Sequence, residues 1–142
     1  MIRFNRALSP VTVLSFDLDD TLYNNHPIIK SALQAQADYL AKLPEWPTND
    51  TQYWLYCRDK ALALDPSLID DVTRWRRAAL LYAMHDLGFK NDLAQQHANN
   101  AYQAFADARS QITVSKEVLG LLKALSKQFR LIAITNGNVE VD

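Results

Sequence analysis

Three carboxylates follow a short apolar run near the start of the chain. Asp17, Asp19 and Asp20 come directly after residues 11–16, a run rich in β-branched and apolar side chains. The length of this run and its lack of helical spacing predict a buried strand. Because open α/β sheets place their sites at the carboxyl ends of parallel strands, the acids are candidates for chemistry.

The spacing of Asp17 and Asp19 adds a geometric expectation. Residues two apart in an extended chain project to the same side. Two carboxylates held close repel unless a cation or a shared proton lies between them. The pair therefore indicates a divalent metal, an acid/base pair, or both. The alternative is that these acids only cap a following helix or solvate a turn.

A second apolar run ends in a hydroxyl residue near the other end of the chain. Residues 131–134 are apolar, and Thr135, Asn136 and Gly137 follow them. The string Phe-Asp-Leu-Asp-Asp-Thr-Leu at residues 16–22 resembles the first motif of the haloacid-dehalogenase-like (HAD) phosphohydrolases. The run that ends at Thr135 resembles their second motif. The chain is thus similar to this family in two short strings, which occur in the expected order.

The resemblance implies a role for each matching residue. Asp17 would be the nucleophile that forms an aspartyl-phosphate and would also ligate Mg²⁺. Asp19 would be the general acid/base, with its backbone carbonyl as a second metal ligand. The Thr135 hydroxyl and the backbone N–H groups of Leu18, Asp19 and Asn136 would hold the phosphoryl group.

Asp19 also separates activities within the family. An alkoxide leaving group needs a proton, whereas a departing halide does not. An acid at this position therefore favours cleavage of phosphate esters over dehalogenation. The sequence thus predicts a Mg²⁺-dependent phosphatase acting on small phosphate monoesters, with a HAD phosphomutase as the alternative.

The interval between the two motifs predicts the domain organisation. It takes up most of the 142 residues, whereas a crossover between parallel strands needs only about a dozen. Its side chains follow helical spacing, so the excess predicts a helical subdomain. Together with this subdomain, the family resemblance implies an α/β protein in which residues 1–22 and 113–142 form a partial Rossmann-like HAD core. Residues 23–112 would form an inserted, all-helical cap.

Several residues mark expected helix ends. A helical region over residues 68–87 should end at Gly88. Asn91 or Asp92 should cap the next helix, and Ser115 should cap the last one.

Three segments suggest a narrower similarity within the family. Residues 14–23, 71–76 and 133–138 resemble bacterial flavin-pathway phosphatases. This resemblance implies FMN or a phosphorylated ribitylaminouracil of riboflavin synthesis as the substrate. Trp75 and Tyr53 have two interpretations, packing in the core or stacking on a flat substrate ring.

A basic cluster lies in the same helical stretch. Arg74, Arg76 and Arg77 follow one another closely. One interpretation is a solvated helix face, and the other is contact with a substrate phosphate or ribityl group.

Composition excludes several classes of function. The net charge is -1, so the chain lacks the basic footprint of a nucleic-acid-binding protein. Cys57 is the single cysteine, which excludes an intramolecular disulfide and a multi-cysteine metal cluster. The sequence contains no apolar run of transmembrane length and no signal-peptide region. We therefore expect a cytoplasmic protein that binds neither membrane nor nucleic acid. The family resemblance implies a small phosphorylated metabolite as its partner.

Two further motifs of the family have no match. The third would supply a lysine and the fourth acidic residues, both after Thr135, where only a few residues remain. We therefore expect the first part of a longer protein, with little activity in residues 1–142 alone and with association through an unfinished sheet edge. The alternative function is a non-catalytic binding or interaction module.

Overall fold

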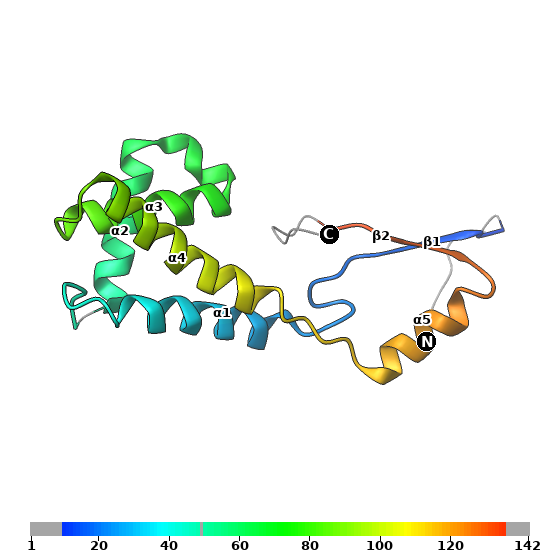
Figure 1. The fold of residues 1–142 in the computed structure, drawn as a ribbon. Coiled ribbons are helices and arrows are strands. Elements are labelled where there is room, and N and C mark those ends of the chain that lie inside the picture. Colours follow the sequence, from blue (N-terminus) through cyan, green and yellow to red (C-terminus); the bar gives the residue numbers. More distant parts are fainter. Residues whose placement is uncertain (1–9, 49, 136–142) are drawn as a thin grey trace. The chain divides into compact units, whose positions relative to one another are not determined.

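The computed structural model describes residues 10–48 and 50–135 (Figure 1). Its order confirms the predicted α/β fold, in which a strand is followed by helices and then by a parallel strand. The elements are β1 (Val13–Phe16), α1 (Asn25–Leu40), α2 (Asp50–Leu64), the 3₁₀ helix η1 (Pro66–Asp70), α3 (Val72–Asp86), α4 (Asn91–Arg109), α5 (Lys116–Leu125) and β2 (Arg130–Ala133).

The strands β1 and β2 lie side by side in parallel (Figure 1). Their register pairs Val13 with Arg130 and Phe16 with Ala133. Ile134 continues the ladder, because its N–H donates to the Phe16 carbonyl over 2.8 Å. The residues that follow the two strands therefore lie at the same end of the sheet, the end where both strands have their carboxyl ends.

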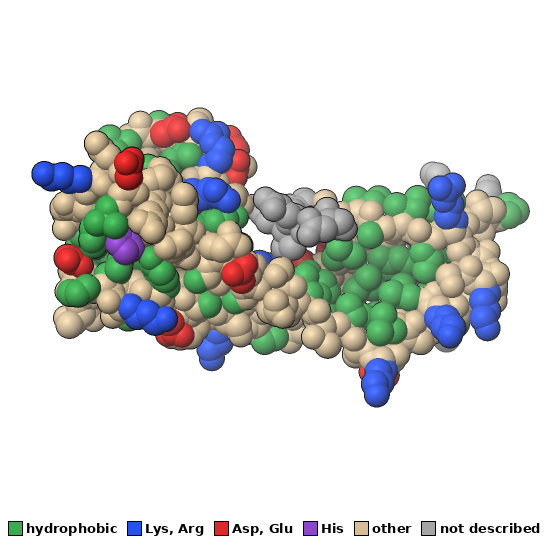
Figure 2. All heavy atoms as spheres, viewed as in Figure 1, with side chains coloured by type: hydrophobic (Ala, Val, Ile, Leu, Met, Phe, Trp, Pro, Cys, Tyr) green, Lys and Arg blue, Asp and Glu red, His purple; other side chains and the backbone are tan. Residues whose placement is uncertain are grey.

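The prediction that residues 11–16 form a buried strand is wrong in its burial and in its start. Val11 precedes β1, and no side chain of β1 is fully buried. Val13 is 43% exposed and Ile132 of β2 is also 43% exposed. The physical reason is that α5 buries none of its own residues, so the described part of the chain forms no closed layer over the sheet. Hydrophobic side chains accordingly gather on the surface around the strands and α5 (Figure 2).

The described residues divide into two compact units. Residues 10–26 and 112–135 form the first, which contains the sheet and α5, and residues 27–111 form the second. Whether residues 23–112 act as a cap stays a prediction. Within the described residues, no helix is long and apolar enough to cross a membrane.

Helices α2, α3 and α4 build the core of the second unit. Its largest fully buried side chains are Leu80, Met84 and Cys57. Buried alanines on α3 and α4, such as Ala83 and Ala98, leave room for the two helices to pack closely. Burial raises the pKa of the Cys57 thiol to about 11, which is expected of a cysteine with a packing role.

Two predicted helix ends are confirmed. Gly88 follows the last residues of α3 with a φ of 90°, a left-handed conformation that glycine adopts without strain. The Ser115 hydroxyl accepts a hydrogen bond from the Val118 N–H over 3.3 Å and thereby caps α5.

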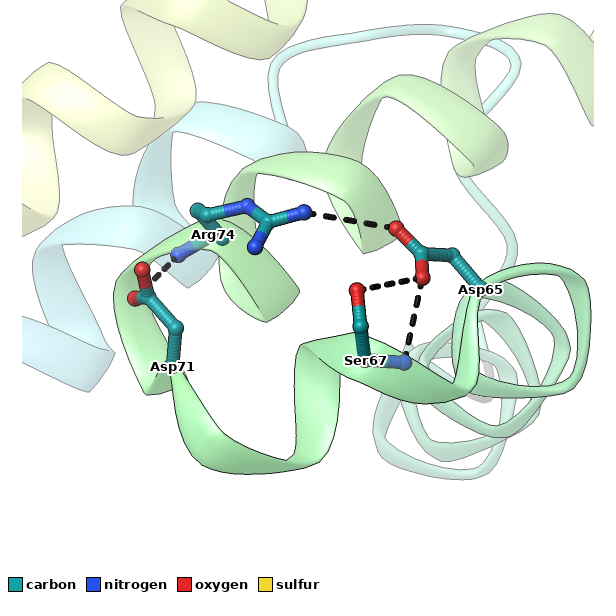
Figure 3. A network of polar contacts seen from close by, with 4 residues as sticks. All are labelled: Asp65, Ser67, Asp71 and Arg74. Atoms are coloured by element: carbon teal, nitrogen blue, oxygen red, sulfur yellow. Dashed lines mark hydrogen bonds and ion pairs between the residues drawn. The ribbon is translucent and has the colours of Figure 1, made fainter.

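Two other expectations are wrong. The helical region predicted over residues 68–87 is broken at Asp71, whose backbone is extended. Asp71 instead caps α3, because its carboxylate accepts from the Arg74 N–H over 2.9 Å (Figure 3). Neither Asn91 nor Asp92 caps α4, since the cap position is Lys90, which makes no side-chain capping bond.

Candidate active site

Asp17 is the first residue after β1, and its side chain is exposed. The Leu18 carbonyl accepts hydrogen bonds from the N–H groups of Thr21 and Leu22, over 3.2 and 3.0 Å. These bonds fold the segment into a turn that brings the Thr21 hydroxyl to 3.5 Å from Oδ2 of Asp17. The predicted nucleophile therefore stands on a compact turn at the end of a strand, with its carboxylate open to solvent.

Asp19 has a different environment. Its side chain is partly buried, and its carboxylate accepts hydrogen bonds from the Tyr23 hydroxyl and from Nδ2 of Asn25, the latter over 3.2 Å. Sequence reasoning assigned no role to either donor. The available signal was the presence of donor side chains within six positions of Asp19. The two donors orient the carboxylate that the sequence predicts to be the general acid/base.

Asp20 connects the segment that holds the three acids, residues 17–20, to the following helix. Its backbone has a φ of 56°, in the left-handed region, and it begins the turn over residues 20–22. Its carboxylate then accepts from the N–H of Asn25, the first residue of α1, over 2.8 Å. This bond satisfies one of the N–H groups that a helix start leaves unpaired, so for Asp20 the alternative interpretation, an acid that caps the following helix, describes the contact.

Asn25 contacts two of the three acids. Its side-chain amide donates to Asp19 and its backbone N–H donates to Asp20. Its side-chain oxygen Oδ1 is buried and accepts no hydrogen bond from a described residue. The Asn25 side-chain amide is thus a dipole whose N–H end points at the Asp19 carboxylate.

The candidate phosphate-binding residues lie on both strand ends. Thr135 follows β2 by two residues and is exposed. It lies at the same end of the sheet as Asp17, which follows β1. Leu18 is partly buried, and its N–H has no hydrogen-bond acceptor in the part of the chain that the structure describes. Asn136 lies outside the described residues.

The donor set at Asp17 fits a magnesium ion in its chemistry. Mg²⁺ binds through one or two carboxylates and otherwise keeps water and substrate oxygens. Asp17 supplies an exposed carboxylate, whereas the Asp19 carboxylate is already engaged by two donors. Across residues 10–48 and 50–135, no three His, Cys, Asp or Glu side chains group together as a complete metal site.

The three arginines of α3 have three different environments. Arg74 is exposed and pairs with Asp65 over 3.4 Å (Figure 3). Arg77 is exposed and lies over the Tyr102 ring, and Arg76 is partly buried over the Phe105 ring. The solvated-face interpretation therefore does not describe Arg76.

Trp75 and Tyr53 both pack inside the second unit. The Trp75 indole N–H donates to the Arg58 carbonyl over 2.8 Å, and its ring packs against the cluster that contains Leu68. The Tyr53 hydroxyl donates to Asp86 over 2.7 Å. Burial, together with this hydrogen bond, raises the pKa of Tyr53. These contacts favour the packing interpretation of both rings.

Comparison with known proteins gives three matches. The sequence model of the haloacid dehalogenase-like hydrolase family matches residues 11–141. The chain is 38% identical over 143 residues to the 5-amino-6-(5-phospho-D-ribitylamino)uracil phosphatase YigB of Escherichia coli (strain K12). That match covers 98% of this chain and 59% of the relative.

A solved structure is similar over the same part of the chain. The crystal structure of 2-haloacid dehalogenase from Pseudomonas syringae pv. Tomato DC3000 has a TM-score of 0.79 and 35% identity, and the match covers 93% of this chain and 58% of that one. The chain thus spans less than two thirds of the length of either protein. The family match extends over both strands and everything between them, and the chain belongs to the haloacid dehalogenase-like hydrolase family.

Proposed function

We propose that this chain carries the nucleophile and the general acid of a phosphatase that hydrolyses small phosphate monoesters. The observation that carries the proposal is the contrast between Asp17, exposed at the strand end, and Asp19, held by two donors two residues later. Two carboxyl groups in different environments are suited to different roles in one reaction. The similarity to a curated phosphatase supports the same reaction class.

In the first step, an oxygen of Asp17 attacks phosphorus, and the bond from phosphorus to the alcohol oxygen breaks. Asp19 gives its proton to that leaving oxygen. In the second step, Asp19 takes a proton from water as the water oxygen attacks phosphorus, and the bond from phosphorus to the Asp17 oxygen breaks. Inorganic phosphate leaves, and Asp17 and Asp19 return to their starting states. Tyr23 and Asn25 keep the Asp19 carboxyl oriented through both steps.

Mg²⁺ is proposed as the cofactor, held by Asp17 and by the backbone carbonyl of Asp19. When bound, such an ion neutralises charge between a carboxylate and a phosphate dianion. The Leu18 N–H, the Thr135 hydroxyl and the Asn136 N–H would donate to the phosphoryl oxygens.

The substrate class is proposed from similarity. The relative from Escherichia coli is named as a phosphatase of a phosphorylated ribitylaminouracil. We propose that compound or FMN as the substrate.

The chain matches 59% of this relative, so a chimera in which the relative supplies the rest tests the function. Residues 1–142 replace the matching part of the relative, and release of phosphate from a chromogenic ester is measured with Mg²⁺. We expect turnover that Asp17→Asn abolishes. The matched control is Asp38→Asn, an exposed carboxylate on α1 whose loss should leave turnover unchanged. Equal activity of the two variants would refute the proposed role of Asp17.

The exposed sheet supports a second candidate function, association with another copy through the edge of β1 or β2. Both strands are edge strands in the described two-stranded sheet, and Ile134 is 62% exposed beside them. Unpaired strand edges and exposed apolar side chains favour pairing with another chain. Sedimentation should show oligomers of residues 1–142 that Ile132→Lys disperses. Leu64→Lys, at a 75% exposed position in α2, is the control, and an equal effect of both changes would refute association through the sheet.

A further inference from the structure

Three helices of the second unit meet around the side chain of Arg76. Its guanidinium carbon lies 3.9 Å from the centre of the Phe105 ring of α4. Its Nη1 donates to Oε1 of Gln36, a buried residue of α1, over 3.0 Å. The side chain of Arg76 therefore has a fixed position, because one hydrogen bond and one ring contact hold it from two different helices.

No carboxylate within residues 10–48 and 50–135 pairs with Arg76. Among the described residues, the structure gives one ion pair, and it joins Arg74 to Asp65. Burial, and after it the like charge of Arg58, lowers the pKa of Arg76 to about 10. A partly buried cation beside a second cation is unfavourable unless an anion or hydrogen-bond acceptors compensate it.

Arg77 extends the same surface. Its guanidinium carbon lies 3.9 Å from the centre of the Tyr102 ring, which is three residues before Phe105 on α4. The centres of these two rings are 6.5 Å apart. Arg76 and Arg77, consecutive residues of α3, are thus each stacked on one of two neighbouring rings of α4.

Stacking leaves the hydrogen-bonding edges of both guanidinium groups available. A ring contacts the flat face of a guanidinium, whereas the N–H groups point outward in its plane. Arg77 is exposed, and none of the nitrogens of Arg76 is buried without a partner, so those that lack a hydrogen bond reach solvent. Such forked N–H edges match the oxygens of phosphate and carboxylate groups.

We propose that Arg76 and Arg77, stacked on Phe105 and Tyr102, form a binding site for the phosphate or carboxylate group of a small ligand. The site lies wholly within residues 27–111 and does not rest on the proposed phosphatase reaction. The competing explanation is that Arg76 only ties α1, α3 and α4 together.

The test follows the Nε–Hε NMR signals of the arginines during titration with inorganic phosphate in a buffer prepared without Mg²⁺ and without any carboxylate compound, so that no metal ion binds at Asp17. We expect saturable shifts of the Arg76 and Arg77 signals. Arg74 is the internal control, because its guanidinium already pairs with the Asp65 carboxylate. A second titration with glycerol phosphate shows whether an ester binds better than free phosphate, and saturable shifts with either probe support the site.

Variants separate binding from folding. Arg76→Lys keeps the charge but loses the planar fork, so phosphate affinity should fall about tenfold, the usual effect of losing one charge-assisted hydrogen bond. Phe105→Leu should weaken binding while leaving both arginines in place. The proposal is overturned if the three arginine signals drift together without saturation. It is also overturned if Arg76→Lys binds phosphate as tightly as the unchanged chain.

Discussion

The side-chain amide of Asn25 donates to the Asp19 carboxylate over 3.2 Å, from the first residue of helix α1. This bond links the start of a helix to the predicted general acid/base. With the Tyr23 hydroxyl on the same carboxylate, it gives Asp19 two oriented donors that Asp17 lacks.

Removing the Tyr23 hydroxyl should slow the reaction without unfolding the chain. Tyr23→Phe takes away one donor to a carboxylate, a contact whose loss typically costs about tenfold in rate. We expect that decrease in kcat of the chimera, with a smaller effect on KM. Tyr56→Phe is the matched control, since Tyr56 is exposed and its hydroxyl lies 3.4 Å from that of Tyr82. A loss of the same size in both variants would show that Tyr23 acts only through folding.

Replacing Asp19 should discriminate between leaving groups. Asp19→Asn cannot protonate a departing alkoxide, so alkyl phosphates should be cleaved about 10²–10⁴-fold more slowly. The leaving group of an activated aryl phosphate needs little protonation, so Asp19→Asn should slow the cleavage of these esters much less. The measurement is kcat/KM of the chimera for both ester types. Equal losses would mean that Asp19 has only a structural role.

Asp65 should contribute to stability in a pH-dependent way. Hydrogen bonds from the Ser67 hydroxyl, and then its backbone N–H and the charge of Arg74, hold the Asp65 pKa below its usual range (Figure 3). The native state therefore favours the ionised carboxylate. Its contribution is present above the pKa of the unfolded chain and is lost as the pH falls through the lower folded value.

Thermal unfolding of Asp65→Asn measures this contribution. The Tm of this variant should lie below that of the unchanged chain at neutral pH, and the gap should close in acid. Asp59→Asn, an exposed position on α2, provides the comparison. A gap that is constant with pH would contradict the role assigned to the ionised carboxylate.

Local chemistry explains which features the sequence could predict. Ser115 and Gly88 act on their own helix ends through one hydrogen bond and one backbone conformation, so their roles are visible in the sequence. The burial of β1 depends on what covers the sheet, and no residue of β1 carries that information. The break at Asp71 was missed because residues on both sides of it are helical, and only the cap geometry separates them.

In the candidate site, too, residue types could be predicted from the sequence, whereas contacts between residues could not. Asp17 and Asp19 could be singled out from their type and spacing after a strand. Tyr23 and Asn25 could not be assigned as their neighbours, because the chain reaches Asp19 again only after it turns through the left-handed backbone of Asp20. Arg74, Arg76 and Arg77 look alike in the sequence and differ only through their partners on other elements.

Asp17 is the residue proposed to take up the phosphoryl group, and trapping the covalent intermediate identifies that residue chemically. The chimera is mixed with a phosphate ester, quenched in acid and treated with borohydride, which reduces an aspartyl-phosphate to homoserine. Mass spectrometry of the peptides then locates the change. We expect homoserine at position 17, and none there in Asp17→Asn. A phosphorylated or reduced residue elsewhere, in a chimera that still turns over, would contradict it.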